Sequence, residues 1–442
     1  MRIQLSDHFT YKKLIAFTLP SIIMMIFTSI YGVVDGFFVS NIVGKTPFAA
    51  VNFIMPVLMI LGCFGFMFGT GGSALIAKTI GEGEREKANK IFSLLVYVTL
   101  FLSVILSVVS IIFMPRIART LGAQGKLLRD CILYARLILP ALPFYMLQFE
   151  FQSFFVVAEK PKLGLYVTVV SGVTNMVLDA LFMAVFRWGL AGAALATAIS
   201  QIIGGIIPLV YFSRDNTSLL RLAKTEYDGR ALLKTCTNGS SELMSNISVS
   251  LVGMLYNIQL LKYAGENGIA AYGVLMYVNF TFLAAFIGYT VGSAPVISYH
   301  FGAQNHAELK NLRRKSTVII SVFALMMFFM AEAFAYPLSY VFVGYDKVLM
   351  NMTLRGFLIF SFSFLFAGFA IFGSGFFTAL NDGLTSAVIS FLRTIIFQVA
   401  AVLVLPLIWE LDGIWISIVA AEIMAVIITG VFLVAKRKRY KY

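Results

Sequence analysis

The sequence is poor in charged residues. Of its 442 residues, 12% are Asp, Glu, Lys or Arg, whereas soluble domains carry about 25%. Hydrophobic residues make up 60% of the chain, and the mean hydropathy is +0.89. A water-soluble core cannot bury this much apolar surface, so the composition excludes a soluble globular protein and predicts a membrane protein.

Residues that build catalytic and metal centres are also scarce. The few cysteines and histidines show no disulfide-type or metal-type spacing: Cys63, Cys131, Cys236, His8, His300 and His306. The glycine-rich run at 69–72 lies inside an apolar stretch and lacks the Lys-Ser/Thr pair of a phosphate-binding loop. We therefore expect no enzyme, no ATP hydrolysis and no cofactor.

What the sequence does contain is a series of apolar runs, each long enough to cross a bilayer. They predict an all-α polytopic membrane protein with twelve transmembrane helices and no soluble domain. The predicted spans are 14–39, 48–77, 91–114, 131–157, 163–186, 189–213, 233–261, 269–300, 316–343, 354–380, 384–408 and 411–435.

The net charge of +13 is distributed unevenly between the loops. If the N-terminus is cytoplasmic, most Lys and Arg residues fall on the cytoplasmic side, as the positive-inside rule requires. We therefore expect a multi-pass protein of the plasma (inner) membrane with both termini in the cytoplasm. The basic tail then contacts anionic lipid, and no nucleic-acid partner is expected.

The second half of the chain repeats the first at a shift of about 221 residues. Matching pairs include Gly44 with Gly265, Gly81 with Gly302, and Trp188 with Trp409. Six helices per half is an even number, so the halves are predicted to form two parallel, pseudo-symmetric six-helix bundles around a cavity. The predicted division is an N-lobe at 1–213, a cytoplasmic linker at 214–232, a C-lobe at 233–435 and a basic tail at 436–442.

Away from the span ends, six carboxylates interrupt the predicted spans: Asp35, Glu150, Asp179, Glu242, Glu332 and Glu422. A charge inside a bilayer costs at least a few kcal/mol, so each is a candidate functional residue. Away from the span ends, only Arg136 and Arg393 are bases, and either could pair with an acid. The acid excess favours a cation as coupled ion or substrate.

The strongest candidates lie in the first half. Tyr31 and Asp35 share a face of the first helix, and Asn175 and Asp179 are one turn apart on the fifth. With the hydroxyl of Thr197, these side chains supply oxygens for Na⁺, or hold a proton, since adjacent carboxylates oppose each other's ionisation. The alternative is that each acid pairs with a base for assembly.

Further candidates are less specific. Pro20 interrupts the first helix and is a predicted hinge. Glu242 and Asn246 belong to a polar stripe on the seventh helix, which lines either the cavity, a second ion site or a helix–helix contact. Glu150 is a candidate for the cavity or a second ion site.

Several segments resemble the MATE (multidrug and toxic compound extrusion) family, with the nearest likeness to its bacterial MepA-like and DinF-like branches. These segments are Leu19-Pro20-Ser21, Val34–Ser40 closing with Gly44, Asn175–Asp179 and Trp188–Thr197. Their order and spacing extend the likeness over essentially the whole chain.

The resemblance implies an antiporter that exports organic drugs, mainly cationic, in exchange for H⁺ or Na⁺. We expect a monomer that works by alternating access, because two parallel bundles can rock about the cavity between them. The resemblance also implies an ion site at Asp35, Asn175, Asp179 and Thr197, with bending at Pro20. Glu242 matches an acid of the NorM-type branch, but residues 357–380 contain no acid, so a NorM-type second Na⁺ site is not expected.

Two other functions stay open. A flippase for lipids or lipid-linked oligosaccharides, of the same superfamily, would typically have fourteen helices and a basic cavity. The second is a membrane receptor or scaffold that transports nothing, but such a protein has no use for an internal repeat with buried acids.

Overall fold

The computed structural model describes residues 3–43 and 45–442, which are almost entirely helical and contain no strand. Gly44, which closes the first motif of the family resemblance, lies outside the described residues. In a bilayer every backbone N–H and C=O must be paired within the protein, and helices meet this demand segment by segment.

The first half runs through α1 Tyr11–Phe38, η1 Val39–Val43, α2 Lys45–Gly81, α3 Arg85–Thr120, α4 Gly125–Ile138, η2 Leu139–Ala141, α5 Leu142–Val157, α6 Pro161–Asp179, η3 Ala180–Val185 and α7 Gly189–Ser213. The second half runs through α8 Gly229–Gly302, α9 His306–Val343, α10 Lys347–Phe360, η4 Ser361–Ser363, α11 Phe364–Ala379, α12 Gly383–Phe391, η5 Leu392–Phe397, α13 Gln398–Val404, α14 Pro406–Ala435 and α15 Arg437–Tyr440. Here η1, η3 and η5 are π-helical and η2 and η4 are 3₁₀ turns.

In the described part of the chain, eleven helices are long and apolar enough to span a membrane. One of them, α8, has 74 residues and is broken at Gly265, whose φ of 64° and ψ of −153° are not helical. Glycine adopts a positive φ without a Cβ clash, so it suits this break. With α8 counted as two spans, the predicted all-α fold of twelve membrane helices is confirmed.

Side-chain caps fix the starts of several helices in the second half. The carboxylates of Asp228, Asp346 and Asp382 and the amide oxygen of Asn305 accept backbone N–H bonds at the starts of α8, α10, α12 and α9. Such caps satisfy donors that have no partner inside the helix. They place the helix ends at the polar surfaces rather than in the apolar belt.

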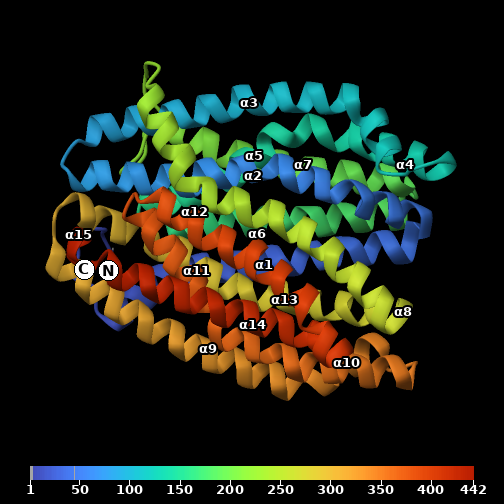
Figure 1. Ribbon diagram of the computed structural model, residues 1–442. Helices are drawn as coiled ribbons and strands as arrows, with labels where there is room; N and C mark the ends of the chain where they lie inside the picture. Colours follow the sequence, from blue (N-terminus) through green and yellow to red (C-terminus); the bar gives the residue numbers. More distant parts are fainter. Residues whose placement is uncertain (1–2, 44) are drawn as a thin grey trace.

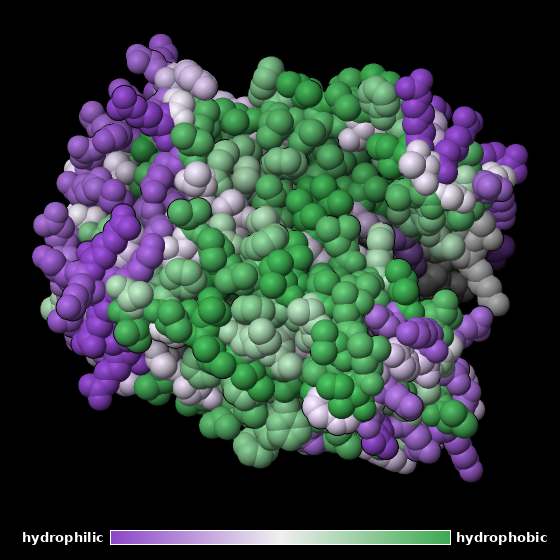
Figure 2. All heavy atoms as spheres, in the orientation of Figure 1, coloured by the Kyte–Doolittle hydropathy of each residue, from purple (hydrophilic) through white to green (hydrophobic). Residues whose placement is uncertain are grey.

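The two chain termini lie at the same end of the molecule (Figure 1). Figure 2 shows an apolar belt between two polar ends, as expected for a protein that crosses a bilayer. We call the end that carries both termini the terminus end. The predicted boundaries of lobes, linker and tail stay predictions; residues 214–228 form a non-helical connection between α7 and α8.

The two halves touch backbone to backbone at the terminus end. A Cβ on Gly81 of α2 would collide with the carbonyl oxygen of Tyr299 on α8, and a Cβ on Gly302 with that of Lys78. The internal repeat relates these two contacts, because Gly81 matches Gly302 and Lys78 matches Tyr299. The halves therefore meet here through a reciprocal, two-fold-like interface.

Hydrogen bonds reinforce this closure. Asn381 donates from Nδ2 to the carbonyl of Ala74 at 3.2 Å and so joins the two halves. The N-terminal segment bridges them as well: Leu5 N donates to Glu159 Oε1 at 2.8 Å, and Phe9 N to Glu308 Oε1 at 2.9 Å. The structure is thus closed at the terminus end.

Candidate functional site

Asp35 and Asp179 each lie where an α-helix changes to a π-helix. Asp35 stands four residues before η1, and Asp179 is the last residue of α6, immediately before η3. Segments of π-helix are rare in proteins, but those that occur are often found at functional sites, since the extra residue shifts the helix register locally. The side chains are 7% and 0% exposed, so both acids are buried.

The structure brings together the four residues predicted for the ion site. The carboxyls of Asp35 and Asp179 lie close enough to influence each other's ionisation across the contact between α1 and α6. Asn175, one turn before Asp179, donates from Nδ2 to Thr197 Oγ1 of α7 at 3.4 Å. Gly172 of α6 makes room for α1, since a Cβ there would lie 3.2 Å from Tyr31 Cδ1.

This cluster has unused oxygen atoms. Among the described residues, Asp35 Oδ1 and both carboxyl oxygens of Asp179 have no hydrogen-bond partner. No described Lys or Arg forms an ion pair with either acid. Two carboxyls, an amide and a hydroxyl are oxygen donors of the kind that bind hard cations, and the carboxyls can equally take a proton.

Tyr134 of α4 also belongs to the cluster, and sequence reasoning missed it. Its side chain is 1% exposed, interacts with the Thr197 hydroxyl and lies within electrostatic range of Asp35 and Asp179. It stands between apolar neighbours with no polar periodicity around it. A buried tyrosine in a membrane helix is the available signal, because its hydroxyl needs a partner.

Pro20 lies inside α1, which stays helical from Tyr11 to Phe38. On either side of Pro20, α1 is held tightly against α8: Gly292 approaches Thr18, and a Cβ on Gly288 would lie 2.8 Å from the Ser21 carbonyl oxygen. The later part of α1, with Asp35, also packs on α6, while Ser29 Oγ still shares a 3.2 Å hydrogen bond with Thr281 Oγ1 of α8. Pro20 therefore lies within the part of α1 that is held against the second half, fifteen residues before Asp35.

In the second half, Glu422 is paired with a base. Arg393 Nε donates to Glu422 Oε2 at 2.9 Å and Nη2 to Oε1 at 2.8 Å, with both side chains largely buried. The hypothesis that Arg393 neutralises an acid agrees with this geometry, whereas Arg136 is exposed. Glu332 accepts a hydrogen bond from Ser361 Oγ.

The remaining candidates differ in their surroundings. Glu242 is half-buried and lies within electrostatic range of Arg393 and of Cys63 on α2, so it stands between the two halves. Asn246 donates from Nδ2 to the Glu242 carbonyl at 2.8 Å, which commits this donor to its own helix. Tyr31 is half-buried near Asp35, and Glu150 is fully buried.

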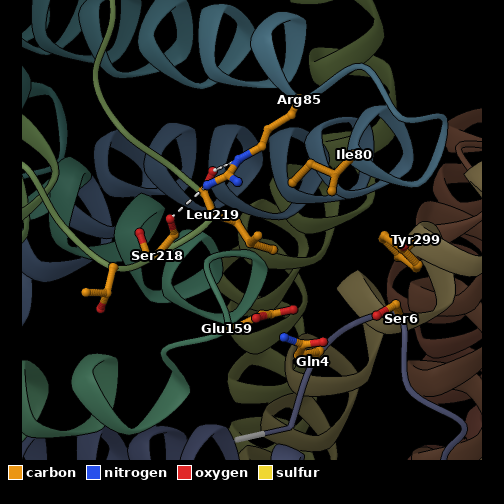
Figure 3. A pocket seen from close by; sticks show the side chains of 9 residues that line it. Gln4, Ser6, Ile80, Arg85, Glu159, Ser218, Leu219 and Tyr299 are labelled. Atoms are coloured by element: carbon orange, nitrogen blue, oxygen red, sulfur yellow. Dashed lines mark hydrogen bonds between the residues drawn. The ribbon is translucent and has the colours of Figure 1, made fainter.

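A polar cavity of about 350 Å³ is lined by Gln4 and Ser6 of the N-terminal segment together with Arg85 and Tyr299, so it lies at the terminus end (Figure 3). Arg85 borders it and donates to the carbonyls of Ser218 and Leu219 at 3.1 and 3.3 Å. Asp179 lies eighteen residues along α6 from Pro161, or about 27 Å at 1.5 Å per residue. The cavity therefore belongs to the closed end rather than to the acid cluster.

The family model MatE matches the chain twice, at residues 20–181 and 243–403. The chain belongs to the MatE family. The two matches start at equivalent points of the two halves, which agrees with the internal repeat. The family recognised from the motifs around Pro20, Asp35 and Asp179 is thus confirmed.

Named relatives and solved structures agree with this assignment. "Multidrug export protein MepA" of Staphylococcus haemolyticus is 28% identical over 72% of this chain and 70% of its own length. The protein of the same name from Staphylococcus saprophyticus is 25% identical over 93% and 91%. A crystal structure of MATE in complex with MaL6 covers 98% of both chains with a TM-score of 0.93 and 21% identity, and so shows the same fold.

Proposed function

We propose that this MATE-family protein is a secondary-active multidrug efflux antiporter that exports organic compounds, mainly cationic, in exchange for H⁺ or Na⁺. The observation that carries the proposal is the buried Asp35–Asp179 pair, which has unpartnered oxygens and no compensating base among the described residues. Such groups inside a membrane span mark ion pathways. The relatives named as multidrug export proteins support drugs as the substrates.

Coupling follows from the placement of the acid cluster on α1. A proton or Na⁺ neutralises the carboxyls and removes the repulsion between the two buried charges. The Asp35 part of α1 then moves relative to the part fixed at Gly288 and Gly292, with Pro20 as the hinge. Ion and drug each change the other's affinity, because both bias the same two-state arrangement of the halves.

The drug is expected to bind between the halves. Glu242 offers a negative charge there, and Tyr31 adds an aromatic face beside Asp35. Carboxylates and aromatic faces both attract organic cations. If the termini are cytoplasmic, as the loop charges predict, the closed terminus end makes this the outward-facing conformation.

The test is ethidium export by purified protein in liposomes under separately imposed pH and Na⁺ gradients. The Asp35→Asn variant is expected to lose gradient-driven export, while Glu226→Gln, which changes an exposed acid in the linker, retains it. Export by Asp35→Asn at the wild-type rate would exclude the proposed ion site. Movement of a labelled lipid, without any ethidium export, would favour the flippase function instead.

A further inference from the structure

Glu150 of α5 is a third buried acid of the first half, apart from the Asp35–Asp179 pair. Its side chain is 0% exposed, and neither carboxyl oxygen has a hydrogen-bond partner among the described residues. Thr99 of α3 is also 0% exposed, its Oγ1 has no hydrogen-bond partner among the described residues, and its hydroxyl lies near the Glu150 carboxyl. Buried polar groups are nearly always satisfied, so two such side chains facing each other indicate a ligand site.

No described countercharge compensates this carboxyl. The helices packed against α5 carry titratable groups that do not bond to Glu150, among them Cys63 on α2, Tyr97 on α3, Asp179 on α6, Tyr211 on α7 and Glu242 on α8. An ionised carboxylate buried alone costs far more than a neutral one. The site therefore calls for a bound cation.

The chemistry of the site selects a proton. Glu150 and Thr99 together offer three side-chain oxygens, whereas hard metal ions take about six or more. The backbone carbonyls of α3 and α5 at this level lie inside helices, where they accept helical hydrogen bonds. A proton needs a single carboxyl oxygen and converts the carboxylate to a neutral acid.

Glu150 lies next to the contact that closes the terminus end. A Cβ on Gly69 of α2 would lie 3.0 Å from Glu150 Cα, and two residues further along α2 a Cβ on Gly71 would collide with the Thr235 carbonyl of α8. Glu150 is seven residues, about 10 Å, from the end of α5 at Val157. It is therefore nearer to the closed end than Asp179 is.

We infer that Glu150 is a second proton-binding site, occupied while the terminus end is closed and emptied to that side when α2 separates from α8. The inference rests on the proposed antiport. It adds one proton, bound to the Glu150 carboxylate as a carboxylic acid and later released to water, to the ion taken up at the Asp35–Asp179 pair.

The experiment measures how the equilibrium ethidium gradient depends on an imposed pH gradient in liposomes, with the membrane potential clamped at zero. If the Asp35–Asp179 pair takes up H⁺, wild type exchanges two protons and gives a logarithmic slope of two, and Glu150→Gln is expected to give a slope of one. If the pair takes up Na⁺, the two slopes without a Na⁺ gradient are one and zero. At a one-unit pH gradient the ethidium ratio then falls about tenfold. An unchanged slope in Glu150→Gln overturns the inference and leaves the proposed antiport intact.

A second measurement does not depend on transport. Infrared spectra of the wild-type protein in lipid bilayers are expected to show a protonated-carboxyl band that Glu150→Gln removes and Thr99→Val shifts. Thr99→Val keeps the acid and the side-chain volume, so it carries the test if Glu150→Gln fails to fold. A spectrum without such a band overturns the inference, even if wild type exports no ethidium and the proposed antiport fails.

Discussion

Buried carboxylates have different partners in the two halves of the molecule. In the first half, Asp35 and Asp179 interact with each other and have no described basic partner. In the second, Arg393 holds Glu422 through two nitrogens. A buried pair of opposite charges is neutral and strongly held, whereas unpaired carboxyls stay available for a cation. Ion chemistry is therefore expected mainly in the first half.

The repeat preserves the scaffold and changes the chemistry. Gly81 and Gly302 make equivalent backbone contacts at the closed end. Asp35, by contrast, matches Tyr256, a buried hydroxyl that shares a 2.7 Å hydrogen bond with Ser417 Oγ. A neutral, satisfied pair thus occupies the position of the acid, so the symmetry of the fold does not extend to the ion site.

The largest effect is expected when a base is placed beside the unpaired acids of the first half, as Arg393 stands beside Glu422 in the second. Asn175→Lys puts an amine one turn from Asp179, where it pairs with the acid as Arg393 pairs with Glu422. We expect ion-driven ethidium export to fall by about tenfold or more, because the fixed charge replaces the mobile cation. Asn175→Gln keeps an amide and is the matched control. Export by Asn175→Lys at the control rate would show that the acid pair does not bind the coupled ion.

The reverse change removes the base from the second half. Arg393→Met leaves Glu422 buried and unpaired, which is expected to destabilise the protein by about 3 kcal/mol. Arg393→Met with Glu422→Leu removes both charges and should recover most of that loss. Thermal unfolding in detergent measures the three proteins. If Arg393→Met alone is as stable as wild type, Glu422 is not held by this pair.

The sequence predicted the fold more completely than the site. Apolar runs alone located the spans, because the bilayer demands helices of set length, and Asp35 and Asp179 stood out as charges where lipid allows few. Two features were out of reach. Tyr134 looks like an ordinary core residue until α4 packs beside Thr197. The sequence suggested that Arg393 pairs with an acid but not that the acid is Glu422, which lies 29 residues away on another helix.

The symmetric contact at the closed end can be tested from both sides. Gly81→Ala and Gly302→Ala each place a methyl group against a backbone carbonyl of the other half, so both should weaken the closure to a similar extent. We expect Cys236, half-buried on α8, to react several-fold faster with a maleimide in both variants. Gly253→Ala is the control, since nothing lies within 4 Å of its added Cβ. Unequal effects would show that the two contacts are not equivalent.

The smallest expected effect concerns matching loops at the terminus end. In the first half, Lys160 Nζ donates to Thr217 Oγ1 of the segment that follows α7. In the second, Asp382 accepts from Lys436 Nζ, at the end of α14, at 2.7 Å. Each loop therefore holds the segment that leaves its own half.

Burial alone would raise the pKa of the Asp382 carboxyl. The hydrogen bonds from Lys436 and Thr385 outweigh burial and leave this pKa below its usual value. Because the pKa of Asp382 is lower in the folded than in the unfolded protein, the ionised carboxylate stabilises the fold at pH values above the unfolded-state pKa. This stabilisation is lost as the pH falls through the folded-state pKa. Lys436→Met should therefore lower stability by about 1 kcal/mol at neutral pH and by less in strong acid. Thermal unfolding of wild type and Lys436→Met from neutral pH to strong acid measures the difference in stability between them. A difference that grows as the pH falls would contradict the ion pair. Lys160→Met, which removes no carboxylate partner, should show no such pH dependence, because the first half holds its segment through a neutral hydroxyl.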